Sequence, residues 1–497
     1  MRNTKYLQLF RNWIWLQAAI WFFMFGTLSC NDDLSKSGGA GKLSFSTDTV
    51  RFDTVFTSVG SVTNKFLIYN KSNSELLINA IALSGGKSSI FKMNVDGMVS
   101  ADNQFSNIKL RPNDSVYVFV SVTVNPNNSD NPVLVEDAIS FTCGSVQQKV
   151  VLNAIGQDVI LMKNRRISSD SLLTAQKPFL IMGDLTVDSL KTLTISAGCK
   201  LYFHKDGNLK VKGTLIANGS FEKPILMRGD RLDSIKFDIH FPYNNIWGQW
   251  GGVTLKGAGH HHLLQHVYMN GGAYGILATN SDMNQTSDIK IEYSRIHNFT
   301  TTGLKSENCN LDVSNTEISN TGSYCVYIKG GKHSFIHCTI ANYFNNSDLA
   351  GLIKNSRDKT PALLIMNMER CAPMESNFQN CIITGSVENE FSLATLFPET
   401  YNGNFESNYI KRTAPLTTPQ FKNTKWFAKN DTVFKVIQYL SKKDMYFDFR
   451  LDSVSKARGL ANKVIAAKYP LDMLGNDRNI GNSPDLGAYQ WMPQKEK

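Results

Sequence analysis

The chain has 497 residues, of which 42% are hydrophobic and 19% charged, and its formal net charge is +10. Its length predicts two or three domains, and its hydrophobic fraction excludes an intrinsically disordered chain. Arg2, Lys5 and Arg11 precede Cys30, so a chain beginning at Cys30 would carry +7. This mild excess suits acidic glycans or lipopolysaccharide phosphates, but the repeat region lacks the Lys/Arg-rich run of a nucleic-acid patch, and we predict no nucleic-acid partner.

The first residues have the three zones of a secretion signal. A basic start is followed by an apolar stretch from Trp13 to Phe25 and then by GTLSC. Because the apolar stretch is shorter than the roughly 20 residues that span a bilayer, we expect residues 1–29 to be a signal peptide that is removed.

A cysteine directly after such a stretch resembles the lipobox of bacterial lipoproteins, with Leu28 and Ser29 before Cys30. The commonest lipobox has a large aliphatic residue three positions before the cysteine, where this chain has Thr27. The resemblance implies lipidation of Cys30 and an outer-membrane anchor in a Gram-negative bacterium. The CNDD sequence is similar to acidic tags of surface-exported lipoproteins, which implies exposure at the cell surface. An uncleaved anchor helix and a plain signal peptide are the alternatives.

The remaining cysteines do not form a recognisable site. They are odd in number and no CxxC spacing occurs, so neither a complete disulfide framework nor a zinc knuckle is expected. We expect most of them to be small buried residues. They are Cys143, Cys199, Cys309, Cys325, Cys338, Cys371 and Cys381.

Residues 30–42 contain a Gly/Ser-rich stretch that is typical of a flexible tether. From 43 to 156 the pattern changes to short alternating strands, clearest in SVYVFVSVTVN, where Val116 and Val118 share one face and Tyr117 and Phe119 the other. This pattern predicts a β-sandwich of about seven strands. It resembles immunoglobulin-like modules of the abnormal-spindle-like type, which implies a spacer between the anchor and the next domain.

A repeat of 22 residues follows. It places Ile296, Ile318 and Ile340 at equal intervals, and an asparagine two positions after each of them. A fixed period of this size predicts stacked coils. One coil earlier, an offset of 28 aligns Leu263, Tyr268, Asn270 and Ile276 with the next coil, if six residues are inserted near SDMNQT.

The repeat resembles the right-handed parallel β-helix of the pectate-lyase-like superfamily. Its asparagine column is similar to the superfamily's asparagine ladder, because asparagine tolerates a left-handed corner and its amides can bond along the stack. The ladder residues are Asn270, Asn298, Asn320 and Asn342. We therefore predict an all-β protein with a β-helix of about 22 residues per coil over 157–425 and a C-terminal closing segment over 426–497. In that segment Gln490 replaces the usual glutamate.

Four histidines fall within GAGHHHLLQH. The 28-residue offset predicts that His261 points inward, that His262 points outward, and that His266 aligns with Ser294. Side chains on alternating faces do not converge on one ion, so we predict no metal site here.

The outer faces of the coils carry the candidate site residues. The resemblance implies that a lyase would use Lys or Arg as base and a cation or calcium to neutralise a uronate. Catalytic candidates are Lys290, Arg295 and Lys305, and binding candidates are Glu292, Asp312, Tyr327, Lys354 and Arg357. The alternative is structural, because Lys290 over Asp312 and Arg295 over Glu317 would be ordinary opposite-charge pairs of a solvated sheet.

Three functions remain open. The coils lack the Asp-Asp and Gly-His-Gly motifs of polygalacturonase-like enzymes, and the chain lacks a GxSxG elbow. The first hypothesis is therefore a lipoprotein, anchored in the membrane at Cys30, whose β-helix binds a polysaccharide or an envelope protein without catalysis. The second is a polysaccharide lyase or glycoside hydrolase, and the third a purely structural envelope protein. No cofactor is expected, and calcium would enter only with a lyase.

Overall fold

A computed structural model describes most of the chain from residue 41 onward. The described residues are 41–126, 132–236, 240–257, 260–282, 285–344, 357, 359–368, 374–428, 433–437, 447–480 and 483–493. The predicted signal peptide (residues 1–29), Cys30, Lys354 and Cys371 lie outside them. Within the described residues, no helix is long and apolar enough to cross a membrane.

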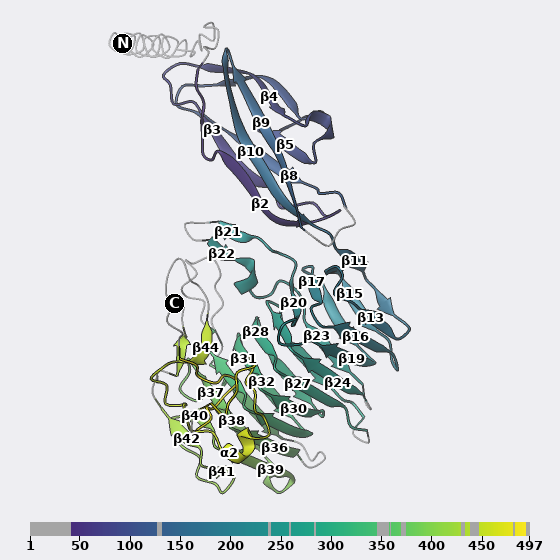
Figure 1. The fold of residues 1–497 in the computed structure, drawn as a ribbon, viewed down its shortest axis with the longest axis vertical. Coiled ribbons are helices and arrows are strands. Elements are labelled where there is room, and N and C mark those ends of the chain that lie inside the picture. Colours follow the sequence, from purple (N-terminus) through teal and green to yellow (C-terminus); the bar gives the residue numbers. More distant parts are fainter. Residues whose placement is uncertain are drawn as a thin grey trace, which may run out of the picture. The chain divides into compact units, whose positions relative to one another are not determined.

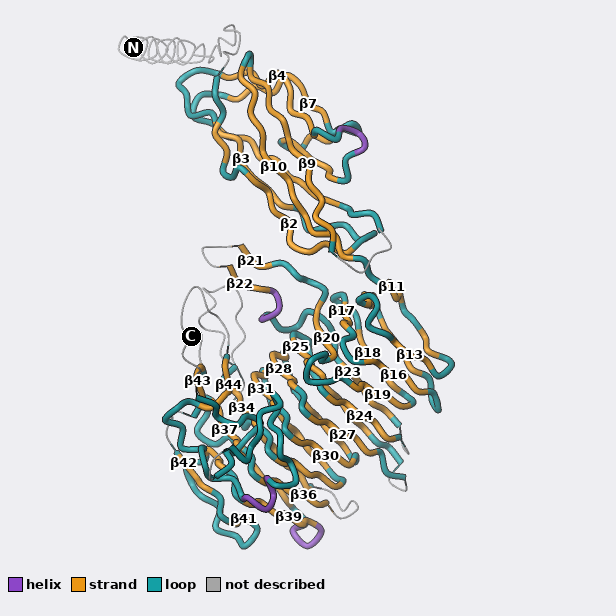
Figure 2. Tube along the Cα trace, viewed as in Figure 1, coloured by secondary structure: helices purple, strands orange, loops and turns teal. Residues whose placement is uncertain are grey.

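The chain divides into two compact units. The first unit comprises Ser61–Thr123, Val135–Ala154 and the chain up to Arg51, and the second comprises Ile155–Lys497 together with Phe52–Gly60 and Val124–Leu134. Each unit is built almost entirely of strands (Figures 1 and 2). The all-β fold class predicted from the sequence is confirmed.

The N-terminal sandwich is formed by two five-stranded sheets. Sheet A contains β2 (Thr49–Phe56), β10 (Val146–Gln157), β9 (Val133–Cys143), β4 (Leu76–Leu83) and β7 (Gln104–Leu110). Sheet B contains β1 (Ser44–Phe45), β3 (Asn64–Tyr69), β8 (Ser115–Val122), β5 (Phe91–Val95) and β6 (Met98–Val99). A short 3-10 turn, η1 (Gly86–Ser88), precedes β5.

Alternation along β8 produces the core of the sandwich. Val116, Val118, Val120 and Val122 are buried, whereas Tyr117 and Phe119 are exposed. Phe66 of β3 meets Phe141 of β9 edge-on, with ring centroids 6.3 Å apart, so apolar faces of sheets A and B pack together. The immunoglobulin-like assignment stays a prediction.

The second unit contains three long sheets in which the strands are parallel, and successive strands of the chain pass from sheet C to sheet D to sheet E. Sheet C contains β11 (Ile160–Lys163), β14 (Phe179–Met182), β17 (Lys200–Phe203), β20 (Ile225–Gly229), β25 (Val267–Asn270), β28 (Arg295–Phe299), β31 (Glu317–Thr321), β34 (Thr339–Asn342), β37 (Ile382–Gly385), β40 (Tyr409–Lys411) and β42 (Lys425–Phe427). This arrangement is a parallel β-helix.

The other two sheets complete each coil. Sheet D contains β12 (Arg166–Ile167), β15 (Asp184–Val187), β18 (Asn208–Val211), β23 (Val253–Lys256), β26 (Ile276–Thr279), β29 (Leu304–Glu307), β32 (Val326–Lys329), β35 (Leu363–Asn367) and β38 (Phe391–Thr395). Sheet E contains β13 (Ser171–Leu173), β16 (Thr192–Ser196), β19 (Thr214–Asn218), β24 (His261–Gln265), β27 (Asp288–Glu292), β30 (Asn310–Ser314), β33 (Lys332–Ile336), β36 (Met374–Gln379), β39 (Tyr401–Glu406) and β41 (Phe421–Lys422).

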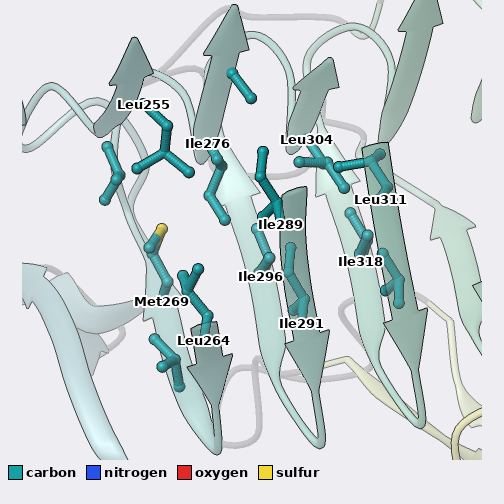
Figure 3. Close-up of a cluster of buried hydrophobic side chains, with 14 of the residues drawn as sticks. Leu255, Leu264, Met269, Ile276, Ile289, Ile291, Ile296, Leu304, Leu311 and Ile318 are labelled. Carbon is teal, nitrogen blue, oxygen red and sulfur yellow. The ribbon is translucent and has the colours of Figure 1, made fainter. Parts of the chain in front are cut away.

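The core of the β-helix consists of apolar columns that run from coil to coil (Figure 3). Ile296 pairs with Ile318, and Ile318 with Ile340, and all three are buried. Each such residue contributes about 1.5–3 kcal/mol when it leaves water. The predicted spacing of 22 residues between these coils is confirmed.

The register of the preceding coil differs from the prediction by one residue. Met269 pairs with Ile296 and Leu264 with Ile291, an offset of 27, whereas Ile276 pairs with Leu304 at the expected 28. The reason lies between β25 and β26, because Ile276 follows Met269 by seven positions whereas Leu304 follows Ile296 by eight. Since a shift of one residue turns every side chain to the other face, Leu264 and Met269 point inward instead of Leu263 and Tyr268.

The same shift reverses two of the histidines. His262 pairs with Ile289 and is 3% exposed, whereas His261 is exposed and pairs with Asp288. The prediction of an inward His261 and an outward His262 was therefore wrong. Burial, and then the neighbouring His260 and His261, lower the pKa of His262 to about 4, so it is a neutral core residue.

Two segments outside the coils lie beside sheet C. The first is an insertion between β20 and β23, which includes β21 (Ser234–Lys236), β22 (His240–Pro242) and η2 (Tyr243–Asn245). The second is the closing segment, with β43 (Phe434–Val436), β44 (Asp448–Leu451) and α2 (Lys463–Ala466), which follows the turn η3 (Pro398–Thr400) and the last coils. Its apolar residues pack against Ala341, Ile382 and Tyr409 on the outer face of sheet C (Figure 1, yellow).

Candidate functional site

The three catalytic candidates lie on three different sheets. Lys290 is in β27 of sheet E, Arg295 is in β28 of sheet C, and Lys305 is in β29 of sheet D. The chain turns sharply between the first two at Tyr293, whose φ is +49°. The candidates therefore face different sides of the β-helix and do not form one catalytic strip.

Lys290 and Lys305 pair with half-buried carboxylates on their own strands. Lys290 Nζ lies 3.0 Å from Glu292, and Lys305 Nζ lies 2.9 Å from Glu307 and 5.3 Å from the ring centre of Tyr327. Pairs of this kind are worth about 0–1 kcal/mol because water and salt screen them. Lys290 thus forms its ion pair with Glu292, whereas the structural alternative paired it with Asp312.

Asp312 aligns with Lys290 on sheet E. Burial raises the pKa of Asp312, Lys290 opposes this rise, and Glu292 adds to it. Sheet E has a shallow hollow of about 660 Å³ at these positions. Its rim contains two further ion pairs, His261 with Asp288 at 2.9 Å and Lys332 with Glu375 at 3.0 Å.

Arg357 is buried instead of projecting toward a ligand. Its Nη1 and Nη2 donate to the Glu390 carboxylate at 2.8 and 2.5 Å, and to the carbonyl oxygens of Asn342 and Thr360 at 2.6 Å. The side chains of Arg357 and Glu390 are 3% and 0% exposed. Arg357 thus fastens the chain to the coils, and the ligand-binding role predicted for it does not fit its contacts.

The asparagine column has two kinds of member. Asn298 and Asn320 have φ of +60° and +50°, the left-handed conformation expected at a corner. Asn270 pairs with His297 instead of Asn298, and Gly271, with φ of +77°, takes the left-handed position in that coil. Asn342 does not have a positive φ. Its Nδ2 donates hydrogen bonds to Thr321 Oγ1 and to the carbonyl oxygen of Ser323.

A second left-handed column, which was not predicted from the sequence, lies at the corner between sheets E and C. Its members are His266, Tyr293, Asn315, His337, Asn380 and Ser407, with φ between +46° and +55°. His266 stacks on Tyr293, with ring centroids 5.0 Å apart, and does not align with Ser294. The asparagines at two of these positions were the signal from which the column could have been found.

A polar pocket lies on the outer face of sheet C. It has a volume of about 290 Å³ and lies between the η2 turn of the insertion and Phe447 of the closing segment. Strands β25, β28 and β31 supply its floor. Its lining is Leu226, Asn244, Asn245, Tyr268, Asn270, Arg295, His297, Asn298, Asn320 and Phe447.

Arg295 belongs to a buried chain of hydrogen bonds. Its Nε donates to Glu317 Oε1 at 2.9 Å, Ser319 Oγ donates to the same oxygen at 2.6 Å, and the hydroxyl of Tyr489 donates to Oε2. The side chain of Arg295 remains 32% exposed toward the pocket. Among the described residues, Nη1 and Nη2 have no hydrogen-bond partner.

Burial and the Arg295–Glu317 ion pair set the ionisation states of the groups in this hydrogen-bond network. Burial lowers the pKa of Arg295, but the carboxylate of Glu317 outweighs it, so the pKa is raised and the guanidinium stays charged. Burial, followed by the Arg295 charge, lowers the pKa of His297 well below 6.5, so its imidazole is neutral at pH 7. Burial and then Glu317 raise the pKa of Tyr489, which stays protonated.

Asn270 lines the pocket and has one unused acceptor. Its Nδ2 donates to the carbonyl oxygen and to Oδ1 of Asn244, at 2.7 and 2.9 Å. Its Oδ1 has no partner in the described structure although the residue is only 4% exposed. A buried acceptor without a partner costs about 1–3 kcal/mol, so a ligand hydroxyl that donates to it would recover that energy.

Only Arg295 and the ladder asparagines of this pocket were among the predicted residues. Tyr268, His297, Asn244, Asn245 and Phe447 were missed. The interruption of the period by residues 230–252 was the signal, since insertions in stacked coils often shape the binding face. Within the described residues, no group of three His, Cys, Asp or Glu side chains is placed to hold a metal ion.

Comparisons with known proteins give no family. No family model matches the chain. Over 99 residues it is 39% identical to protein bark beetle of Drosophila melanogaster, a match that covers 20% of this chain and 3% of that protein. The chain thus spans a small fraction of this relative.

Two solved structures show weak similarity. A family 123 glycoside hydrolase from Clostridium perfringens is 9% identical with a TM-score of 0.18, over 24% of this chain and 28% of that one. The ASH/PapD-like domain 7 of human CEP192 is 11% identical with a TM-score of 0.16, over 27% of this chain and 95% of that one. At these TM-scores neither similarity carries an argument.

Proposed function

We propose that this protein is a surface lipoprotein whose β-helix binds a glycan and receives one sugar unit in the sheet C pocket. The observation that carries the proposal is the unpartnered, buried Oδ1 of Asn270, a residue that lines the pocket together with other polar side chains. The pocket's volume of about 290 Å³ is at the lower end for small-molecule sites, which suits a single sugar ring.

The chemistry of the lining supports a sugar ligand. Amides and a neutral imidazole both donate and accept hydrogen bonds, as neighbouring sugar hydroxyls require. Tyr268 and Phe447 add aromatic surface for the C–H face of a ring. Among the described lining residues there is no Asp or Glu, so the carboxylate pair of a glycoside hydrolase does not occur in the pocket. Binding without cleavage is therefore the proposal.

The binding test is a titration of the purified protein, residues 43–497, with a panel of monosaccharides and oligosaccharides. Asn270→Ala should weaken the best ligand at least tenfold, because the sugar hydroxyl loses its buried acceptor. Lys290→Gln, on sheet E, is the matched control and should leave the affinity unchanged. Equal affinities for wild type and Asn270→Ala would refute the pocket, and a new reducing end or a rise in absorbance near 235 nm would replace binding with hydrolysis or elimination.

The anchoring proposal has a separate test. It rests on the apolar stretch followed by Cys30. Metabolic labelling with a fatty-acid analogue should label the full chain in a Gram-negative host, and Cys30→Ala should remove both the label and the membrane association. Retention of the Cys30→Ala protein in the outer membrane would contradict lipidation at this residue.

A further inference from the structure

We infer that the sheet C pocket selects a neutral sugar over its uronic-acid counterpart, because the charge of Arg295 is already neutralised from within the protein. The inference rests on the proposed glycan binding at this pocket. It concerns the charge of the ligand, which the pocket's volume and hydrogen-bonding groups leave open.

Arg295 and its partner Glu317 are the charged side chains that matter at the pocket. Arg295 is the only charged side chain among the described lining residues. Glu317 lies directly behind it, 2.9 Å from Arg295 Nε and 0% exposed, and forms an ion pair with it beneath the floor. The charge of Arg295 therefore already has a partner within the protein. His297 contributes no charge at pH 7, since burial and Arg295 lower its pKa well below 6.5.

Hydrogen bonds hold the carboxylate of Glu317 firmly. Both of its oxygens accept hydrogen bonds, one from Arg295 and Ser319 and the other from Tyr489. Tyr489 belongs to the closing segment, and the adjacent Ala488 donates its backbone N–H to Thr339 Oγ1 at 2.9 Å. The closing segment thus fixes the carboxylate in place, and Glu317 cannot turn away from Arg295 when a ligand enters.

An anionic sugar would meet two energetic costs in this pocket. A uronate carboxylate that reaches Nη1 and Nη2 of Arg295 would lie close to the fixed carboxylate of Glu317, and like charges in a partly buried site repel strongly. It would also lose its own hydration without gaining a free cation. A neutral sugar meets neither cost, and its hydroxyls can accept from Nη1 and Nη2 and donate to Asn270 Oδ1.

The test compares matched pairs on the wild-type protein at pH 7. The pairs are glucose with glucuronate, galactose with galacturonate, and mannose with mannuronate, each as the methyl glycoside. In the pair that binds best, the neutral sugar should bind at least tenfold more tightly. A uronate that binds as tightly or more tightly overturns the inference but leaves the proposed glycan binding intact. Failure of every sugar and glycan to bind removes the proposed function itself.

Two variants test the charge mechanism. Glu317→Gln leaves Arg295 without its counter-charge, and should shift the affinity ratio of neutral sugar to uronate at least tenfold toward the uronate. The double variant Arg295→Gln/Glu317→Gln keeps the site neutral, and should retain the neutral preference; it also serves where the single variant fails to fold. A ratio unchanged in folded Glu317→Gln, or a uronate preference in the double variant, contradicts the role of the ion pair.

Discussion

Replacing Glu390 with glutamine tests the contribution of a buried ion pair to the β-helix. The carboxylate accepts two hydrogen bonds from Arg357 and two from the backbone N–H groups of Ala362 and Val387, at 2.9 and 2.8 Å. Neither Glu390 nor Arg357 is exposed enough for water to replace these bonds. Removing one partner of a buried pair leaves an uncompensated charge, which costs about 3–5 kcal/mol. We expect Glu390→Gln to lower the free energy of unfolding by this amount.

The assay is equilibrium unfolding in urea, followed by tryptophan fluorescence and by far-UV circular dichroism. The matched control is Glu375→Gln, which breaks an exposed pair with Lys332 and should cost no more than about 1 kcal/mol. Coincident transitions in the two signals check that one free energy describes the unfolding. A loss for Glu390→Gln as small as that of the control would show that burial of this pair does not carry the energy we assign to it.

Two further predictions concern histidines inside the coils. Burial lowers the pKa of His333 to about 3, below the 6.5 of an unfolded chain, so the unfolded state binds the proton first and stability falls as the pH drops from 6.5 toward 3. The urea midpoint of the wild type should decrease when the pH is lowered from 7 to 4.5. His333→Leu, which copies its neighbour Leu311 in the column, should make this decrease smaller. An equal decrease in the variant would contradict the lowered pKa of His333 as its cause. His337 has a φ of +52° in the column that includes Asn315 and Asn380, so His337→Asn should be tolerated while His337→Val costs about 1–2 kcal/mol more, because a β-branched residue fits the left-handed region poorly. Equal thermal midpoints for the two variants would show that the left-handed backbone at residue 337 does not disfavour a β-branched residue.

The architecture of the β-helix was predictable from the sequence because its core residues recur at a constant interval. Ile296, Ile318 and Ile340 appear in the structure as one buried column. The register of the coil before them was not predictable to the residue. The spacing from Met269 to Ile276 is one residue shorter than the matching spacing in the next coil, a small change in sequence that reverses which of His261 and His262 is buried.

The site was less predictable than the fold, because its walls come from outside the repeat. Asn244 lies in the insertion and Phe447 in the closing segment, about 200 positions apart, and no spacing rule links them. Lys290 and Arg295 show the opposite error. They are close in the sequence and both face outward, but the corner at Tyr293 places them on different sheets.

The most direct test of glycan binding in the sheet C pocket is hydrogen–deuterium exchange of the protein with and without its best-binding sugar. The proposal predicts slower exchange at the η2 turn, β25 and β28, where backbone and side chains surround the pocket, and unchanged exchange at β27 and β30 of sheet E. Protection centred on β27 and β30 would move the binding site to the other face and contradict the proposal.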